Sequence, residues 1–250
     1  MALKVSGSNL TRRVTRMPLS PLRCDKATGA LQRYTSSLKG RNMKLNFVLF
    51  TITLFFLAGC AGKVNYTPPI ATPTAKNSIT IDEPVERVWK KIIPSLGSSF
   101  FVINNIDKDS GFINLSYSGD PERYIDCGTV ESHVKNMRGE RRYRFPAASA
   151  YEEYESFDNG QDLFFIKRRM DLEGRINIIL QELSSEQTLV SVNTKYVVTK
   201  DATVTHVQGA SQRLNDTITF NTNGSARFPQ TTKCVATGAL EREVLKNLGI

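Results

Sequence analysis

Residues 170–198 alternate regularly between apolar and polar side chains, and this pattern constrains the fold more than any other. The alternation is interrupted at the polar run Ser184–Gln187 and then resumes. A period of two places the apolar side chains on one face of a strand, and a polar break between two such runs is typical of a turn. The apolar positions are Met170, Leu172, Ile176, Ile178, Leu180, Val190, Val192, Tyr196 and Val198. The sequence therefore predicts a long antiparallel hairpin with one face in water.

Two amphipathic helices are predicted, one near each end of the folded part. The first follows Asp82, a good capping residue, and Pro84, which a first helical turn tolerates. The second follows Thr237 and ends before Gly249. The apolar stripes are Val85, Val88, Trp89, Ile92, Ile93 and Leu96 in the first helix, and Leu240, Val244 and Leu248 in the second. We expect Pro94 to bend the first helix or to end it early.

Short strands fill the remaining legible parts of the chain. Ser78–Ile81 precedes the first helix, and Phe100–Ile106 and Phe112–Tyr117 flank a turn at Asp107–Gly111. The order of elements is β-α-β-β, further strands, then β-β-α. We therefore expect a single α+β domain over residues 77–250, in which an antiparallel sheet packs against an N-terminal and a C-terminal helix.

The net charge of +9 belongs to the first part of the chain. Residues 1–59 hold ten Lys and Arg and one acid, whereas the rest holds 23 basic and 23 acidic residues. The folded part is therefore formally neutral, and its bulk charge gives no support for a nucleic-acid partner.

A short apolar segment precedes Cys60. Lys44 is followed by the apolar run Phe47–Leu57, which is too short to span a bilayer but has the length of a signal-peptide core. The segment ends in Leu57-Ala58-Gly59-Cys60, which resembles the lipobox of bacterial lipoproteins. That resemblance implies cleavage before Cys60 and lipid, palmitate included, on this cysteine. Ala61 at the next position implies transfer to the outer membrane, with the protein facing the periplasm.

These features divide the chain into four parts. Residues 1–42 are expected to be a mis-called upstream extension or a disordered leader, and residues 43–59 a lipoprotein signal peptide. Residues 60–76 are rich in Pro and Thr and are expected to form a lipidated tether. Residues 77–250 are expected to form the periplasmic domain.

The stretch from Ile79 to Tyr117 resembles one domain of the BamC (NlpB) outer-membrane lipoproteins. The matching residues are Val85, Val88, Trp89, Phe101, Val102, Asp107, Gly111 and the strand Ile113–Tyr117. The resemblance implies a helix-grip-like fold and an accessory role beside the machinery that inserts barrel proteins into the outer membrane.

Cys127 and Cys234 form an even pair of cysteines in the part of the chain after Cys60. In an oxidising compartment such a pair is expected to form a structural disulfide. A Cys127 nucleophile with His133 as its base is the weaker interpretation, because no third group that would orient the base is evident.

No catalytic residue, metal ligand or cofactor site is predicted. His133 and His206 are the two histidines of the chain, and their spacing from carboxylates indicates no zinc site. Asp107–Gly111 lacks the closing Glu of a calcium loop. The basic clusters Arg138–Arg144 and Lys167–Arg169 suit either lipid headgroups or acidic partners on the sheet, namely Glu152, Glu153, Glu155 and Asp158.

The sequence thus favours a non-enzymatic lipoprotein, anchored to the membrane through Cys60, that supports envelope or outer-membrane protein assembly through contacts with other proteins. The alternative is a binding module that holds a lipid or another apolar ligand between sheet and helix. In that case the face with Ile176, Ile178, Val190 and Val192 would not be filled by helix side chains.

Overall fold

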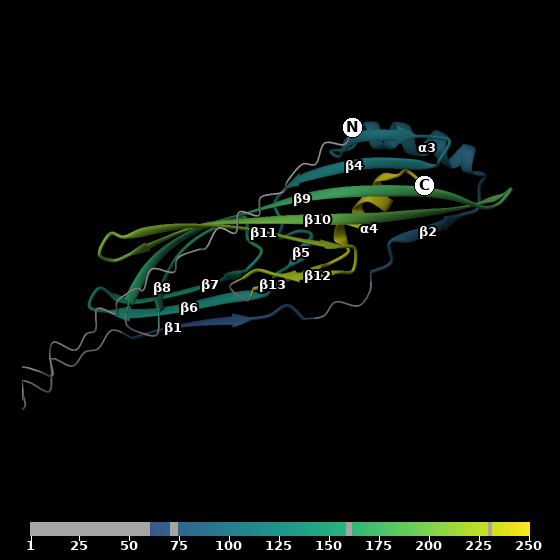
Figure 1. Ribbon diagram of the computed structural model, residues 1–250. Coiled ribbons are helices and arrows are strands. Elements are labelled where there is room, and N and C mark those ends of the chain that lie inside the picture. Colours follow the sequence, from purple (N-terminus) through teal and green to yellow (C-terminus); the bar gives the residue numbers. More distant parts are fainter. Residues whose placement is uncertain (1–60, 71–74, 159–161, 230–231) are drawn as a thin grey trace, which may run out of the picture. The chain divides into compact units, whose positions relative to one another are not determined.

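The computed structural model describes residues 61–70, 75–158, 162–229 and 232–250 (Figure 1). Of these residues, 62% lie in strands and 12% in helices. The strands are β1 Ala61–Thr67, β2 Ser78–Ile81, β3 Val102–Asp107, β4 Phe112–Gly119, β5 Ile125–Asp126, β6 Thr129–Asn136, β7 Gly139–Pro146, β8 Tyr151–Asp158, β9 Asp162–Ser184, β10 Gln187–His206, β11 Ser211–Asn221, β12 Ser225–Arg227 and β13 Lys233–Ala236. The helices are α3 Val85–Gly97 and α4 Ala239–Asn247.

The predicted hairpin is confirmed and is longer than the alternation indicated. Strands β9 and β10 have 23 and 20 residues, and their antiparallel register runs from Ser184 and Gln187 to Phe164 and His206. On its other side β9 pairs with β4 along one half and with β8 along the other. Likewise, β10 pairs with β2 along one half and with β11 along the other. The hairpin therefore runs through both halves of the largest sheet.

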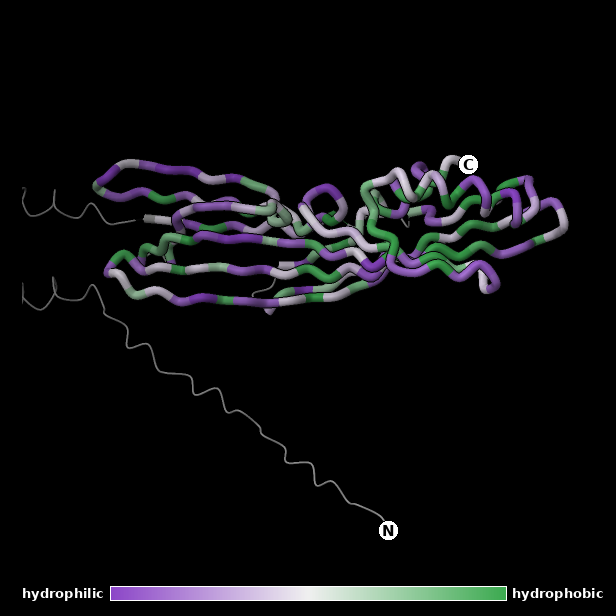
Figure 2. The backbone as a smooth tube through the Cα atoms, turned by 90° about the horizontal axis from the view of Figure 1, so that it is seen from above, coloured by the Kyte–Doolittle hydropathy of each residue, from purple (hydrophilic) through white to green (hydrophobic). Residues whose placement is uncertain are grey.

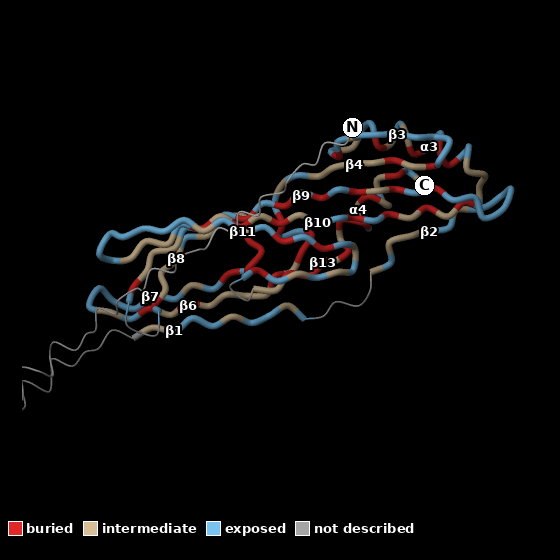
Figure 3. Tube along the Cα trace, in the orientation of Figure 1, coloured by how far each residue is buried: buried red, intermediate tan, exposed pale blue. Residues whose placement is uncertain are grey.

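The half of the hairpin near the β9–β10 turn carries the main core. Ile176, Ile178, Val190 and Val192 are fully buried, and they form one cluster with the apolar stripes of α3 and α4. The stripe residues in this core are Val88, Trp89, Ile92, Leu96, Leu240, Val244 and Leu248. Figure 3 shows buried stretches, in red, on both helices and on the neighbouring strands.

The other half of the hairpin is covered by strands. Strands β1, β6 and β7 form a separate antiparallel sheet, and β1 and β6 contact β8. A small second core lies between these layers, built from Val134, Phe157 and Leu163, with Phe165 beside it. Figure 2 shows that this half is more hydrophilic than the half with the helices. A third small sheet has the order β12-β13-β5.

The expected α+β, helix-grip-like fold is wrong, because the structure is mostly β and has several antiparallel sheets. Residues 119–166, the least legible part of the sequence, hold β5 to β8, with strands where short ones were expected at Arg138–Arg144 and Tyr151–Asp158. Of these strands, β6 and β7 join β1 in a second layer to which the expected fold has no counterpart, β8 belongs to the largest sheet and β5 to the third.

Helix α3 also departs in detail from the sequence prediction. It continues through Pro94 to Gly97, although we expected this proline to bend it or end it early. Its first residue follows Pro84, and the side chain of Asp82 does not cap it. Instead, the Asp82 carboxylate accepts a hydrogen bond from the Gln187 side chain at 2.8 Å. The start of the helix is thereby tied to the β9–β10 turn.

A buried polar group joins α4 to the hairpin. The carboxyl group of Glu241 on α4 is fully buried, and it accepts hydrogen bonds from Tyr196 at 2.7 Å and Thr222 at 2.8 Å. Burial raises the pKa of the Tyr196 hydroxyl well above its ordinary value, and the neighbouring Glu241 adds to this. Both contacts stabilise α4 against the sheet because a buried carboxyl group without partners is costly.

Replacing Tyr196 by Phe should lower the free energy of unfolding by about 1–3 kcal/mol at pH 7. The buried Glu241 carboxyl group then loses the hydrogen bond from Tyr196 and keeps the one from Thr222. Urea denaturation followed by circular dichroism measures this change. Tyr154→Phe is the matched control, since the Tyr154 hydroxyl makes no hydrogen bond to any described residue; its effect should be small.

The difference between wild type and Tyr196→Phe should shrink above pH 10. In that range the unfolded chain loses the tyrosine proton, whereas the folded chain keeps it because its pKa is raised. The free energy of unfolding of the wild type therefore falls as the pH rises above 10. The Phe variant has no tyrosine proton at this position, so its free energy of unfolding lacks this fall. A constant difference from pH 7 to 11 would contradict the role assigned to this hydroxyl.

Candidate functional site

The first described strand begins directly after Cys60. Cys60 itself lies outside the described residues, but its neighbour Ala61 is the first residue of β1. The expectation of a tether over residues 60–76 is therefore wrong for residues 61–67, which belong to a sheet. A signal for this strand exists in the sequence, because Gly62, Val64 and Tyr66 alternate with Lys63 and Asn65. The prolines that follow from Pro68 onward conceal this short alternation.

Strand β1 is held along its whole length by β6. Seven antiparallel residue pairs join the two strands, from Ala61 opposite Lys135 to Thr67 opposite Thr129. One face of the three-stranded sheet, here called the inner face, is turned toward β8. On that face the Ser132 hydroxyl donates a hydrogen bond to the Glu155 carbonyl of β8 at 2.6 Å. The strand after Cys60 is thus part of the folded domain.

Gly62 allows the start of β1 to lie directly on β8. A Cβ atom at this position would be 2.0 Å from the Cδ2 atom of Phe157 and 2.9 Å from its Cβ atom. Phe157 is buried in the second core, so its ring has little room to move away. The requirement for glycine here is steric, and any larger residue would separate the two layers.

The Tyr66 hydroxyl fastens the other end of β1. It accepts a hydrogen bond from the Lys233 backbone N–H at 2.8 Å and lies 3.1 Å from the Cys127 carbonyl, to which it donates. Cys127 and Cys234 form a disulfide with an S–S distance of 2.00 Å, which confirms the predicted bridge. Both cysteines are fully buried. A single hydroxyl therefore connects β1 to both segments that the disulfide joins.

The opposite, outer face of the three-stranded sheet is charged. Lys63, His133 and Arg142 form one row across β1, β6 and β7. An open hollow of about 470 Å³ lies over this row and the next one, and it is lined by Lys63, Asn65, Glu131, Ser132, His133, Arg142, Tyr143 and Arg144. Glu140 pairs with His133 at 2.9 Å and with Arg142 at 2.6 Å. The hydrogen bond from Arg142 is the main cause of a lowered Glu140 pKa, and the one from His133 adds to it.

The basic clusters are largely paired within the domain, either in one sheet or across the two layers. Lys167 lies 3.0 Å from Glu153, and Arg141 bonds to Glu155 on the inner face, as the self-compensating interpretation predicted. Arg144 instead pairs with Glu131 at 3.3 Å, a partner that the sequence did not indicate.

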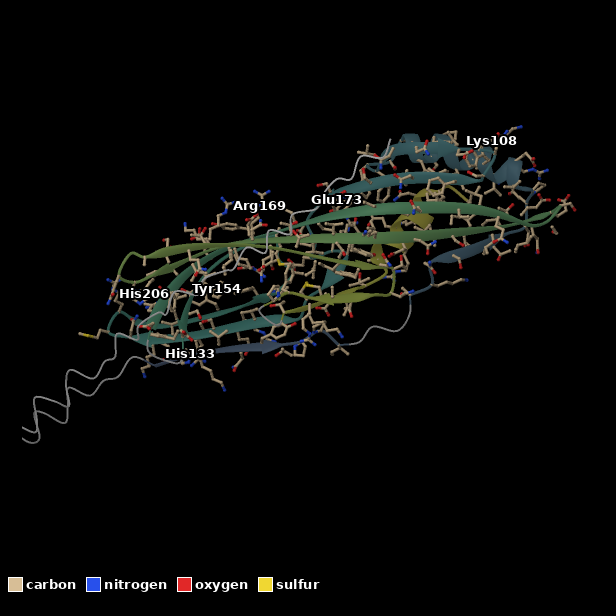
Figure 4. All side chains as sticks on the ribbon, in the orientation of Figure 1. Lys108, His133, Tyr154, Arg169, Glu173 and His206 are labelled. Atoms are coloured by element: carbon tan, nitrogen blue, oxygen red, sulfur yellow. A yellow bond between two sulfur atoms is a disulfide. The ribbon has the colours of Figure 1, made fainter. Side chains whose placement is uncertain are left out.

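The two histidines lie near the same end of the domain (Figure 4). His206 is 3.6 Å from a carboxylate oxygen of Asp162, and His133 is bound to Glu140. Within the described residues, no three His, Cys, Asp or Glu side chains are grouped as metal ligands would be. The Cys127 sulfur is bonded to Cys234, so it is not a thiol beside His133.

Asp107 closes the β3–β4 turn, as the sequence predicted. Its carboxylate accepts hydrogen bonds from the backbone N–H groups of Asp109 at 3.1 Å and Ser110 at 3.3 Å. Hydrogen bonds from Ser110 are the main cause of a lowered Asp107 pKa. This is the local chemistry of a turn residue.

Comparisons with protein-family models, with curated proteins and with solved structures gave no match to this chain. In the part of the chain that the structure describes, no helix is long and apolar enough to cross a membrane.

Replacing Gly62 by Ala should lower the free energy of unfolding by about 1–3 kcal/mol, because the added methyl group overlaps the buried Phe157 ring. Hydrogen exchange should show faster exchange of the β1 and β6 amides. Gly97→Ala is the control, because a Cβ at this helix end meets no atom within 4 Å. Equal effects of the two substitutions would mean that β1 is not packed as described.

Proposed function

We propose that this protein is a lipid-anchored envelope protein that faces the periplasm and acts through contacts with other proteins. The proposal rests chiefly on the position of Cys60, which ends a lipobox-like segment and directly precedes β1. Cleavage before Cys60 would remove none of the described strands or helices. The Cys127–Cys234 disulfide also fits an oxidising compartment.

Membrane attachment through Cys60 would need no spanning helix. Acyl chains on one cysteine, together with a second acyl group on the new amino terminus, are sufficient for stable attachment. Because β1 is paired from its first residue, such an anchor would be joined to the domain without an intervening tether.

Strand β3 is the surface that we propose for protein contacts. It lies at one edge of the largest sheet, so one side of its backbone is not paired within the described sheet. Beside this edge Phe100 and Val102 are 54% and 61% exposed, which is high for large apolar side chains. An exposed edge with apolar side chains can accept an extended segment of another protein as an additional strand. We propose that the partner is a protein of envelope or outer-membrane protein assembly.

The alternative function, an apolar ligand held between sheet and helix, loses support. The face that would line such a cavity carries Ile176, Ile178, Val190 and Val192, all fully buried. Side chains of α3 and α4, among them Ile92 and Leu240, form one cluster with them. This face is filled by the protein itself.

Cells that express the full chain and are fed an alkyne analogue of palmitate should label the wild-type protein, and Cys60→Ser should abolish the label. Cys24→Ser is the matched control and should leave labelling unchanged, because Cys24 lies outside the proposed mature part. Label that persists in Cys60→Ser would overturn the anchor.

A photo-crosslinking amino acid at Val102 should give a discrete adduct with an envelope protein in living cells, because this side chain stands at the exposed edge. The same probe at Glu186 in the β9–β10 turn should give none. If Val102 gives no adduct, or if both positions give the same one, β3 is not the contact surface.

A further inference from the structure

We infer that the end of the domain at which β1 begins lies against the lipid headgroups of the membrane, with the β6–β7 turn touching the bilayer. This inference rests on the proposed anchor at Cys60 and adds an orientation and a lipid-contacting surface. It follows from three features of this end: the distance from Cys60, an exposed apolar tip and the distribution of charge.

The distance from the anchor is set by the strand register. Ala61 pairs with Lys135 at the end of β6, and the turn that leads into β7 follows after Asn136. A strand residue spans about 3.3 Å, so Lys63 lies within about 10 Å of Cys60 along the chain. Acyl chains on Cys60 would therefore hold this end of the sheet at the depth of the headgroups.

The tip itself exposes apolar side chains. Met137 in the β6–β7 turn is 98% exposed, and Val207 in the β10–β11 turn is 50% exposed. Figure 1 shows both turns at the end where β1 begins, and the Val207 N–H donates to the Leu163 carbonyl beside the second core. An exposed methionine at the tip of a hairpin is the kind of side chain that a membrane interface would cover.

Cations surround this tip. Lys63, Lys135 and Arg138 are exposed, and none of them makes an ion pair with a described residue. The acids nearby are Glu140, Asp158 and Asp162; of these, Glu140 is held by His133 and Arg142, and Asp162 faces His206. Basic side chains next to an apolar tip suit a bilayer that contains anionic headgroups.

The turns at the opposite end of the domain carry more acidic than basic side chains. The β3–β4 turn there carries Asp107 and Asp109 on either side of Lys108, and the β9–β10 turn carries Glu186. Figure 4 shows Lys108 at this far end, away from the two histidines. An anionic surface would attract the β1 end and repel the far end, so charge and anchor favour the same orientation.

The test uses the full chain, processed and lipidated in cells, purified in detergent and reconstituted into vesicles of phosphatidylcholine and phosphatidylglycerol at a ratio of about 7 to 3. Single variants Met137→Cys and Lys108→Cys carry an environment-sensitive NBD fluorophore. Processing would remove Cys24, Cys60 would be acylated, and Cys127 and Cys234 form the disulfide, so the introduced thiol is the one labelled.

Nitroxide-labelled headgroups should quench the fluorophore at position 137 at least about threefold more than at position 108. Equal quenching at the two positions, or stronger quenching at 108, overturns the orientation. Protein that does not float with the vesicles at all would instead show that the proposed anchor is wrong, so the two failures are distinguishable.

The charge contribution has its own matched pair of variants. Lys63→Gln, Lys135→Gln and Arg138→Gln together should remove most of the additional quenching at position 137 that phosphatidylglycerol causes over pure phosphatidylcholine. The control variant combines Lys167→Gln, Arg169→Gln and Arg213→Gln, which remove the same charge from β9 and β11. It should leave the additional quenching at position 137 unchanged. An equal loss in both triple variants would show that net charge alone, rather than this surface, governs the contact.

Discussion

The paired backbones of β9 and β10 are the interaction on which the other elements depend. Their antiparallel register continues along both halves of the domain, and every other strand of the largest sheet is paired to them directly or through β4. A shift of this register by one residue would turn Ile176, Ile178 and Val192 toward water and bring Asn177 and Asn193 into the core. The burial of this apolar face therefore fixes the register in the half with the helices, whereas the second core takes Leu163 and Phe165 from the opposite face of β9.

The two halves are stabilised by different means. The half with the helices has a large apolar core, whereas the half with β1, β6 and β7 has the small cluster of Val134, Phe157 and Leu163. Burial of so few side chains gives a modest driving force, so close packing and polar contacts matter more there. Gly62 on Phe157 and the Tyr66 hydroxyl at the disulfide are contacts of this kind. The disulfide further restricts the unfolded chain, because it joins residues that are 107 positions apart.

The sequence allowed the prediction of those elements whose buried face is apolar. The hairpin, the two helices and the strands around Asp107–Gly111 have regular apolar periods, and each is present. Strand β7 illustrates the opposite case, because Arg141 stands on its inner face and pairs with Glu155. Short strands were expected at Arg138–Arg144 and Tyr151–Asp158, but a charged residue on the inner face removes the period of two, so nothing indicated which sheet they join. The layer of β1, β6 and β7 was therefore not predicted, and the fold class was wrong as a result.

The direct junction between Cys60 and β1 determines how a load on the proposed anchor would reach the domain. If the membrane lies beyond the tip of the β6–β7 turn, a pull on Cys60 acts along the axis of β1. The seven pairs with β6 are then sheared together and not opened one after another. Such a geometry resists detachment, since several backbone hydrogen bonds must break in the same step. At the far end of β1, the Tyr66 hydroxyl passes the load to the segments joined by Cys127 and Cys234. A paired strand in this position would therefore hold the domain rigidly relative to the anchor, whereas an unpaired tether of the same length would let it move.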